Sequence, residues 1–237
     1  MHEFLFSISY EEGVDSYADA FIRDHSLRAD AVYSCLVPTR FWRLEAVTGD
    51  PEALDGLEAL LLDESLDRES LSKRRCDAER THSLLTCTDR RRVVYTHLSE
   101  VARCDAVPVI AAQYIPGGSL VELTRRGNEA QWRVLMQDDR KAGMLYDTLG
   151  SRLAEGLSFR FERFAEVDSW ENSLLASNAL PNEQYETLSL AVERGYFETP
   201  REVTLDELAD QLEVPRSTVS YRLRRAVAEV VTDFVRS

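Results

Sequence analysis

Residues 204–226 contain two short amphipathic helical patterns separated by a proline. Thr204 is a suitable N-cap for the first helix, and Glu207 follows three residues later, as in a capping box. Pro215 cannot lie inside a helix but fits the opening turn of the second one, so residues 213–215 are expected to form the turn. Two short helices joined by such a turn make a helix-turn-helix. The inward positions are predicted to be Leu205, Leu208, Ala209, Leu212, Val219, Leu223 and Ala226, with Val214 filling the space between the helices.

The second helix of this motif is predicted to expose a basic, hydroxyl-rich face. Four arginines and no acidic residue lie between positions 216 and 225. Guanidinium groups bind guanine edges or phosphate, and serine and threonine hydroxyls take either role. The first residues of such a helix normally reach base edges in the major groove of DNA. The predicted base contacts are Ser217, Thr218, Ser220 and Tyr221, and the predicted phosphate or guanine contacts are Arg216, Arg222, Arg224 and Arg225.

Helical patterns also flank the motif on both sides. Glu183 to Gly195 is predicted to form a third helix, followed by the aromatic residues Tyr196 and Phe197 over the core. Because residues 182–237 contain no strand pattern, they are predicted to form an all-α domain. The inward face of the third helix is predicted to be Tyr185, Leu188, Ala191 and Val192. Past the motif, an apolar stripe continues through Val227, Val230, Val231 and Phe234, either packing on the first helix or forming a dimer seam.

Residues 1–167 alternate between strand and helix patterns, which indicates an α+β domain. Asp50 and Pro51 give one helix an N-cap and a first-turn proline. Both halves of the region have the order strand, strand, helix, strand, which suggests a duplicated ferredoxin-like ββαβ unit of about 80 residues. Residues 63–83 fit no single pattern, and residues 168–181 are predicted to be a linker. The expected strands are 3–9, 31–37, 41–48, 84–88, 119–125, 131–137 and 158–167, and the expected helices are 14–24, 51–62 and 138–154.

The charge of the chain is unusual for a protein that binds nucleic acid. The formal net charge is -14, and Lys73 and Lys141 are the only lysines among 28 basic residues. A strongly acidic chain that is poor in lysine and retains arginine resembles proteins of haloarchaea. In molar salt the Debye length falls to about 3 Å, so the self-repulsion of the chain is largely screened. The same salt weakens attraction to phosphate, so an acidic DNA reader must depend on close base and shape contacts.

Three segments of the helical domain carry a family resemblance: 195–197 (GYF), 204–209 (TLDELA) and 219–226 (VSYRLRRA). They resemble the C-terminal domain of the haloarchaeal bacterio-opsin activator family. The α+β region is similar to the sensor-like domain that precedes this helix-turn-helix in the family. The resemblance implies transcription regulation by operator binding. Glu213 stands where the family motif usually has glycine, and Pro215 where it has a capping serine or threonine. Glutamate in a left-handed turn costs about 1 kcal/mol, so a distorted turn is expected.

Cysteine, histidine and tryptophan residues of the α+β region suggest further sites. Without a secretory signal, Cys35, Cys76, Cys87 and Cys104 are expected to be reduced thiols. Cys76, His82, Cys87, His97 and Cys104 match no standard zinc spacing, so we expect structural cysteines and surface histidines there and no metal or cofactor. Trp42 and Trp132 occupy similar places in the two halves, either in the core or beside a ligand pocket between the halves. The runs Arg74-Arg75 and Arg90-Arg91-Arg92 are expected to be solvated or paired with acids.

Several functional classes lack support in the sequence. The chain has no glycine-rich phosphate loop, no HExxH and no GxSxG, so an enzyme is not expected. No stretch approaches ~18 uncharged apolar residues, and the N-terminus lacks a signal-peptide pattern, so we expect a cytoplasmic protein without a membrane span.

Together these features predict a two-domain regulator. Residues 1–167 are expected to sense a ligand or a partner or to dimerise, and residues 182–237 to bind double-stranded promoter DNA, with a homodimer as one arrangement that the apolar stripe allows. Two alternatives remain open. One is an adaptor that uses the three-helix unit to bind protein, and the other is a small-molecule-binding α+β protein with a dimerising helical tail. Binding of DNA in high salt distinguishes them.

Overall fold

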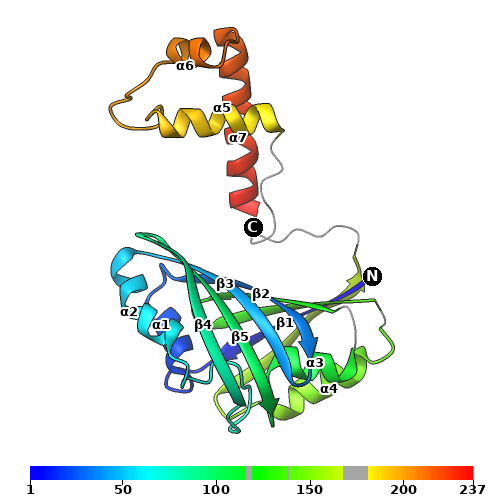
Figure 1. The fold of residues 1–237 in the computed structure, drawn as a ribbon. Helices are drawn as coiled ribbons and strands as arrows, with labels where there is room; N and C mark the ends of the chain where they lie inside the picture. Colours follow the sequence, from blue (N-terminus) through cyan, green and yellow to red (C-terminus); the bar gives the residue numbers. More distant parts are fainter. Residues whose placement is uncertain (116–118, 138, 168–180, 237) are drawn as a thin grey trace. The chain divides into compact units, whose positions relative to one another are not determined.

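A computed structural model of the chain describes residues 1–115, 119–137, 139–167 and 181–236. The chain separates into two compact units, Met1–Trp170 and Glu171–Ser237, and each is described by itself (Figure 1). The expected linker 168–181 lies, apart from Pro181, outside the described residues. No helix in the described parts of the chain has both the length and the hydropathy needed to cross a bilayer.

The first unit is an α+β domain, as predicted, and its strands form one antiparallel sheet. The sheet contains eight strands in the order β4-β5-β3-β2-β6-β7-β1-β8. The strands are β1 (His2–Tyr10), β2 (Arg28–Val37), β3 (Arg40–Thr48), β4 (Asp77–Thr88), β5 (Arg91–Ala102), β6 (Leu120–Arg126), β7 (Glu129–Met136) and β8 (Leu157–Glu166). The helices are α1 (Ser16–Arg23), α2 (Pro51–Leu62), α3 (Val107–Tyr114) and α4 (Ala142–Arg152).

The predicted repeat of strand, strand, helix, strand is present in both halves of the unit. It consists of β2-β3-α2-β4 in the first half and β6-β7-α4-β8 in the second. When β1-α1 and β5-α3 are added, each repeat has the βαββαβ order of a ferredoxin-like unit. The first strand of each repeat lies in the sheet half of the other repeat, because β1 pairs with β7 and β8 while β5 pairs with β3 and β4. The two repeats are therefore interleaved in one sheet.

Three elements of the first unit differ from the sequence predictions. The strand β5 and the helix α3 belong to no predicted element, and β4 begins at Asp77 rather than near Leu84. Helix α3 is buried on nearly all sides, so its residues show no amphipathic stripe. Strand β4 is an edge strand that alternates between half-buried and exposed residues, which weakens its apolar pattern.

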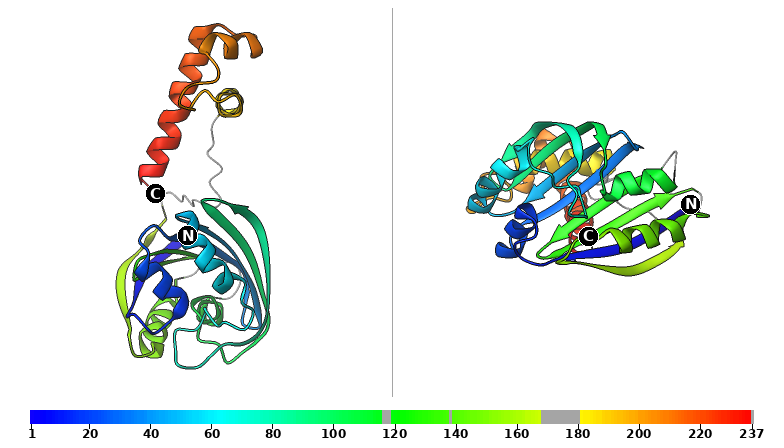
Figure 2. Two further views of the ribbon diagram at one scale, coloured as in Figure 1. Left: turned by 90° about the vertical axis from the view of Figure 1, so that its left-hand side faces the viewer. Right: turned by 90° about the horizontal axis from the view of Figure 1, so that it is seen from below.

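The helices α1–α4 pack on one face of the curved sheet (Figure 2). One hydrophobic cluster joins α1 and α2 to the sheet around Phe21, Val47 and Leu57. A larger cluster joins α3 and α4 to the sheet around Phe6 and Ile110. Side chains alternate along each strand, so the intervening residues lie on the opposite face. That face carries cross-strand ion pairs, as expected for an antiparallel sheet with one face toward water.

The two tryptophans lie on opposite faces of the sheet. Trp132 is buried in the larger cluster, with its ring centre 5.5 Å from that of Tyr33. Trp42 follows the core residue Phe41 along β3 and therefore faces the other way, where it lies 6.1 Å from Tyr95. The two rings cannot flank one pocket, so that alternative in the sequence analysis is wrong.

Charged residues are buried between the two hydrophobic clusters. Arg43 on β3 lies with its guanidinium 2.9 Å from Glu69 and 3.4 Å from Glu45. Arg68 lies 3.3 Å from Glu45, and the Tyr17 hydroxyl donates to the same carboxylate at 2.8 Å. Burial alone would raise the pKa of Glu45 and Glu69, but the neighbouring guanidinium groups outweigh it and hold both pKa values below the usual range. The network therefore keeps both carboxylates ionised inside the domain.

The expectation of four reduced thiols is wrong for one pair, because Cys76 and Cys104 form a disulfide. These cysteines are 28 residues apart and flank the β4–β5 hairpin. Cys87 is free and exposed. The side chain of Cys35 is not among the described ones.

Candidate DNA-binding interface

The second unit consists, in its described part, of α5 (Asn182–Glu193), α6 (Leu205–Gln211) and α7 (Arg216–Arg236). Its core is small and lies where these helices meet. As predicted, Ala191, Leu208, Ala209, Val219 and Leu223 form the buried centre, and Val214 packs against it. The low bulk of Ala209 allows α6 and α7 to cross closely. The all-α prediction for this unit is confirmed.

One face of α5 differs from its prediction. Tyr185 and Val192 are 61% and 62% exposed, so they do not face the core. Thr187, which lies next to the predicted inward residue Leu188, is buried instead. Its hydroxyl donates to the carbonyl oxygen of Glu183 at 2.6 Å. Since this hydrogen bond satisfies the hydroxyl, a polar residue takes the inward place. A prediction that assigns only apolar residues to the core therefore places the buried face of α5 on the wrong side of the helix.

The start of α6 has the predicted capping box. The Thr204 hydroxyl accepts a hydrogen bond from the Glu207 backbone N–H at 3.3 Å, and the Glu207 carboxylate accepts from the Thr204 backbone N–H at 2.8 Å. The backbone and then the hydroxyl of Thr204 lower the pKa of Glu207 by hydrogen bonding to its carboxylate. Two of the free N–H groups at the helix start are thus satisfied, which fixes where α6 begins.

The turn between α6 and α7 contains a glutamate in the left-handed region. Glu213 has φ +53°, a conformation that favours glycine. The turn is closed by hydrogen bonds from Val214 N–H to the Ala209 carbonyl at 3.1 Å and from Glu213 N–H to the Asp210 carbonyl at 3.4 Å. Helix α7 then starts at Arg216, with Thr218 N–H bonded to the Pro215 carbonyl at 2.8 Å.

We expect the Glu213→Gly variant to stabilise the second unit by up to about 1 kcal/mol, because glycine removes the steric cost of a positive φ. Hydrogen exchange of the amides in α6 and α7 measures this change without interference from the first unit. Glu213→Val is the matched control, since a β-branched side chain disfavours the same conformation and should speed up exchange. Equal exchange in both variants would show that Glu213 is not strained.

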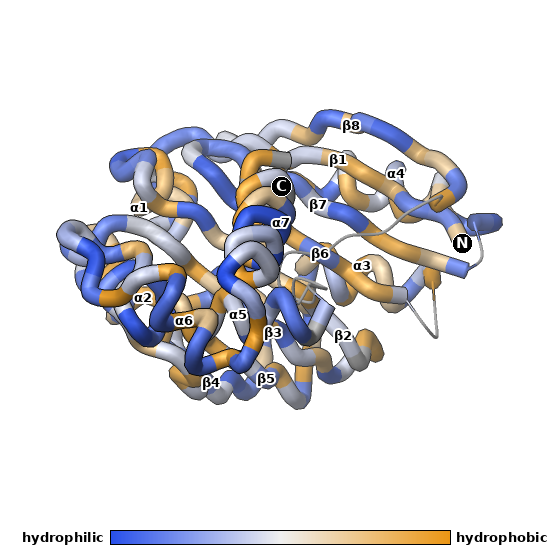
Figure 3. The backbone as a smooth tube through the Cα atoms, turned by 90° about the horizontal axis from the view of Figure 1, so that it is seen from above, coloured by the Kyte–Doolittle hydropathy of each residue, from blue (hydrophilic) through white to orange (hydrophobic). Residues whose placement is uncertain are grey.

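Helix α7 presents two distinct faces over its first three turns. Val219, Leu223 and Ala226 are buried, as predicted. Ser217, Tyr221 and Arg224 follow one another at i, i+4 and i+7, which puts them on one exposed stripe opposite the core. Arg216 and Arg225 are also exposed, whereas Thr218 and Ser220 are half-buried. Hydrophilic and hydrophobic stretches alternate along α7 (Figure 3).

The four arginines in the first three turns of α7 have different surroundings. Arg222 is half-buried and forms an ion pair with Glu183 of α5, so it joins two helices of the unit. Arg216 lies 3.3 Å from Asp206 of α6, with both side chains exposed. Among the described residues, Arg224 and Arg225 have no acidic partner. Their guanidinium groups are therefore the most available for an external anion.

The last turns of α7 extend past the core. Val227 and Val230 are half-buried, whereas Val231 and Val235 are exposed. A helix of this length spans about 32 Å, which is more than contact with one major groove requires. The predicted apolar stripe is thus partly uncovered, and its fourth member, Phe234, has a side chain outside the described set.

The cysteines and histidines of the first unit do not converge. Cys76 and Cys104 are bonded to each other, and no group of three possible metal ligands occurs among the described residues. His82 is half-buried, with Nδ1 2.9 Å from the Thr96 hydroxyl, and burial followed by the charges of Arg68 and Arg43 lowers its pKa. It is not a surface histidine.

Two family models match the chain. Residues 3–170 match a family described as the HVO_2928 N-terminal domain, and residues 180–232 match one described as an HTH DNA-binding domain. No curated protein matches the chain. The second match confirms the predicted helix-turn-helix. The two matches together agree with the resemblance to the haloarchaeal bacterio-opsin activator family.

Proposed function

This chain belongs to the family of the HVO_2928 N-terminal domain and ends in a DNA-binding helix-turn-helix, and we propose that it is a sequence-specific transcription regulator of a halophilic archaeon. One observation carries the proposal. The first three turns of α7 expose Ser217, Tyr221 and Arg224 on one stripe, beside Arg225, with no acidic residue between positions 216 and 225. A partner-helix groove would not need this concentration of guanidinium and hydroxyl groups.

In the proposed complex the start of α7 lies in the major groove. Ser217, Thr218, Ser220 and Tyr221 face base edges, and Arg216, Arg224 and Arg225 bind guanine or phosphate. Arg222 belongs to the same proposed set, and its ion pair with Glu183 lets it act by holding α5 against α7 while its remaining N–H groups reach phosphate. Half-buried Ser220 is limited to a close contact at the edge of this surface.

High salt explains how an acidic chain can perform this role. The Debye length of about 3 Å in molar salt confines electrostatics to direct contacts. Recognition then depends on direct contacts between side chains of α7 and the DNA, while the net charge of -14 keeps the chain soluble. Such a protein would act beside the chromosome, in the cytoplasm.

The apolar end of α7 supports a further part of the proposal, dimerisation. Exposed Val231 and Val235 follow half-buried Val230 on the last turns. Pairing with a second copy would cover them and would give operators with two half-sites roughly 34 Å apart. Residues 1–167 would then be the regulatory domain, joined through residues 168–181 to the DNA-binding domain at 182–237.

The regulatory role of the first unit is supported by a cavity. Its volume is about 570 Å³, within the range of small-molecule sites. Tyr10, Asp15, Leu66, Leu71, Arg75 and Leu157 are among the residues that line it. This mixture of apolar and charged groups suits a small polar ligand.

Genome-wide DNA occupancy in the native high-salt cell tests the proposed function. The full chain is compared with an Arg224→Ala, Arg225→Ala double variant that retains its helical content. We expect discrete promoter peaks for the wild type and none for the variant. If the wild type gives no peaks, the helical unit binds protein instead and the adaptor alternative takes its place.

A further inference from the structure

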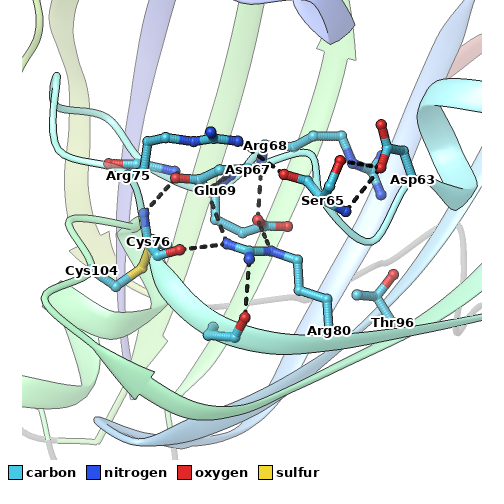
Figure 4. Close-up of polar contacts among 12 residues, drawn as sticks. Asp63, Ser65, Asp67, Arg68, Glu69, Arg75, Cys76, Arg80, Thr96 and Cys104 are labelled. Carbon is cyan, nitrogen blue, oxygen red and sulfur yellow. Dashed lines mark hydrogen bonds and ion pairs between the residues drawn. A yellow bond between two sulfur atoms is a disulfide. The ribbon is translucent and has the colours of Figure 1, made fainter.

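Residues 63–76 form an irregular segment that connects α2 to β4 and is held mainly by polar contacts (Figure 4). Glu69 is the central residue, with its carboxylate 2.9 Å from Arg43 on β3 and 3.4 Å from Arg80 on β4. Arg68 lies over the ring of Tyr17 on α1 at 4.6 Å. The segment thus reaches two strands and a helix through its charged side chains.

The Cys76–Cys104 disulfide closes the end of this segment. Both cysteines are buried, with exposed fractions of 4% and 5%. The Asp67 carboxylate accepts a hydrogen bond from the backbone N–H of Cys76, which ties the segment back on itself (Figure 4). Next to Cys104, Asp105 accepts from Leu71 N–H at 3.1 Å and from the Ser72 hydroxyl at 2.7 Å. The disulfide therefore joins the end of residues 63–76 to the turn after β5, where Asp105 binds the same residues through hydrogen bonds.

The same segment forms one wall of the cavity in the first unit. Leu66, Asp67, Leu71 and Arg75 line that wall. Leu71 also accepts a hydrogen bond from Ala154 N–H at 2.7 Å, which connects the wall to the turn after α4. Movement of the segment would change the size and the charge of the cavity.

The start of β4 and the end of β5 are held together by the sheet itself, without the disulfide. Asp77, directly after Cys76, pairs with Ala102, two residues before Cys104, in the β4–β5 ladder. Breaking the sulfur–sulfur bond leaves this hairpin intact and keeps the two thiols near each other, so the bond can form again. The disulfide adds a covalent link between residues 63–76 and the turn after β5, where the other contacts are the hydrogen bonds of Leu71 and Ser72 to Asp105 and the bridge of Ser70 to Ala106.

We propose that Cys76 and Cys104 form a reversible thiol–disulfide site, reduced by a small dithiol, whose reduction releases residues 63–76 from the cavity. The redox context rests on the proposed function: a protein that binds chromosomal DNA works among reducing thiols, where disulfides are usually transient. A thiolate of the dithiol attacks one cysteine sulfur, and the other cysteine leaves as a thiolate and takes a proton. The second thiolate of the dithiol then attacks the mixed disulfide and releases the first cysteine. The protein gains two electrons and two protons, and the dithiol becomes a cyclic disulfide.

The test uses the full chain in molar KCl without denaturant, with dithiothreitol as the dithiol. Each cysteine is assigned by alkylation and peptide mass spectrometry, and exposed Cys87 is the internal control that labels throughout. We expect Cys76 and Cys104 to be joined in air-equilibrated protein and to become labelled after dithiothreitol, while the tryptophan fluorescence of the chain keeps its folded spectrum. Two free thiols before reduction, no reduction without denaturant, or the fluorescence spectrum of unfolded protein after reduction would each overturn the proposal.

Trypsin reports the release of the segment directly. Lys73, Arg74 and Arg75 lie in the segment, and Arg90 and Arg91 at the other end of the same hairpin are the matched control. We expect cleavage at 73–75 to become about tenfold faster on reduction and cleavage at 90–91 to stay the same, because proteolysis follows the population of the open segment. Reoxidation should reverse the effect. Equal rates before and after reduction at 73–75 would contradict the proposal.

A Cys76→Ser, Cys104→Ser double variant should be cleaved quickly at 73–75 with or without dithiothreitol. If the variant does not fold, the reduction and reoxidation of the wild type still decide the question. No readout in this set involves DNA, so failure of the redox proposal and failure of the DNA-binding proposal are distinguishable.

Discussion

Replacing Arg43 with methionine is expected to lower the free energy of unfolding of the first unit by about 3–5 kcal/mol, because it leaves buried carboxylates without their shared partner. The guanidinium of Arg43 lies between Glu45 and Glu69 and within 3.4 Å of the Thr96 hydroxyl. Methionine fills much of the volume but provides no charge or donor. Buried pairs are screened by salt much less than exposed ones, so the effect should persist in molar KCl.

Urea unfolding followed by tryptophan fluorescence measures this change in the first unit alone. Residues 181–237 contain no tryptophan, whereas Trp42 and Trp132 lie in the sheet. Arg23→Met is the matched control, because the Arg23 side chain is 65% exposed and its pair with Glu12 lies in water. We expect a change within about 1 kcal/mol for that control. A loss below about 1 kcal/mol for Arg43→Met would mean that the buried ion pairs do not form as described.

The pH dependence of the Arg43→Met variant gives the same prediction a second readout. In the folded wild type the pKa values of Glu45 and Glu69 are lower than in the unfolded chain. The two carboxylates therefore contribute to the free energy of unfolding above the unfolded pKa, and this contribution is lost as the pH falls through the folded pKa values. Without Arg43 the depression weakens or reverses, and acid should then destabilise the variant less than the wild type. The difference in free energy of unfolding between the wild type and the variant is expected to become smaller as the pH falls.

The Arg224→Ala, Arg225→Ala variant is expected to lose operator affinity by about a hundredfold or more, because each good bidentate contact contributes about 1–3 kcal/mol. Neither arginine has an acidic partner among the described residues, so the free protein should keep its stability and helical content. Fluorescence anisotropy with promoter fragments taken from the occupancy peaks measures the affinity, at several KCl concentrations.

A control of equal charge separates direct contact from net charge. Arg194→Ala, Arg201→Ala removes two positive charges from the same unit but outside α7. We expect it to bind within a few-fold of the wild type, since long-range charge is screened at this ionic strength. Equal losses in both double variants would show that α7 makes no specific contact with DNA.

Local signals in the sequence predicted much of the second unit. The capping box at Thr204 and Glu207, the stop at Pro215 and the inward stripe of α7 each depend on residues within one or two turns, and the structure confirms them. The face of α5 was predicted wrongly because Thr187 satisfies its hydroxyl within its own helix. Which outward residues of α7 contact DNA stays a prediction.

The arrangement of the first unit depends on contacts far apart in the sequence, which periodicity does not encode. Strand β5 could have been found from the β-branched and aromatic run Val93–Thr96, but its place between β3 and β4 could not. The Cys76–Cys104 pair follows from the β4–β5 pairing and matches no spacing rule. The burial of Arg43 and Glu45 could not be predicted from the sequence either, because charged residues on a strand usually indicate a face toward solvent.

The interleaving of β1 and β5 has a consequence for how the protein is made. Strand β1 pairs with β7 and β8, whose residues 129–166 are synthesised more than a hundred residues later. Pairing across such a distance is slow, so β1 must wait in an unpaired state during translation. A gene split between the two repeats would yield fragments that each lack an inner strand of their own half of the sheet. We therefore expect the two repeats of the domain to fold together as one unit.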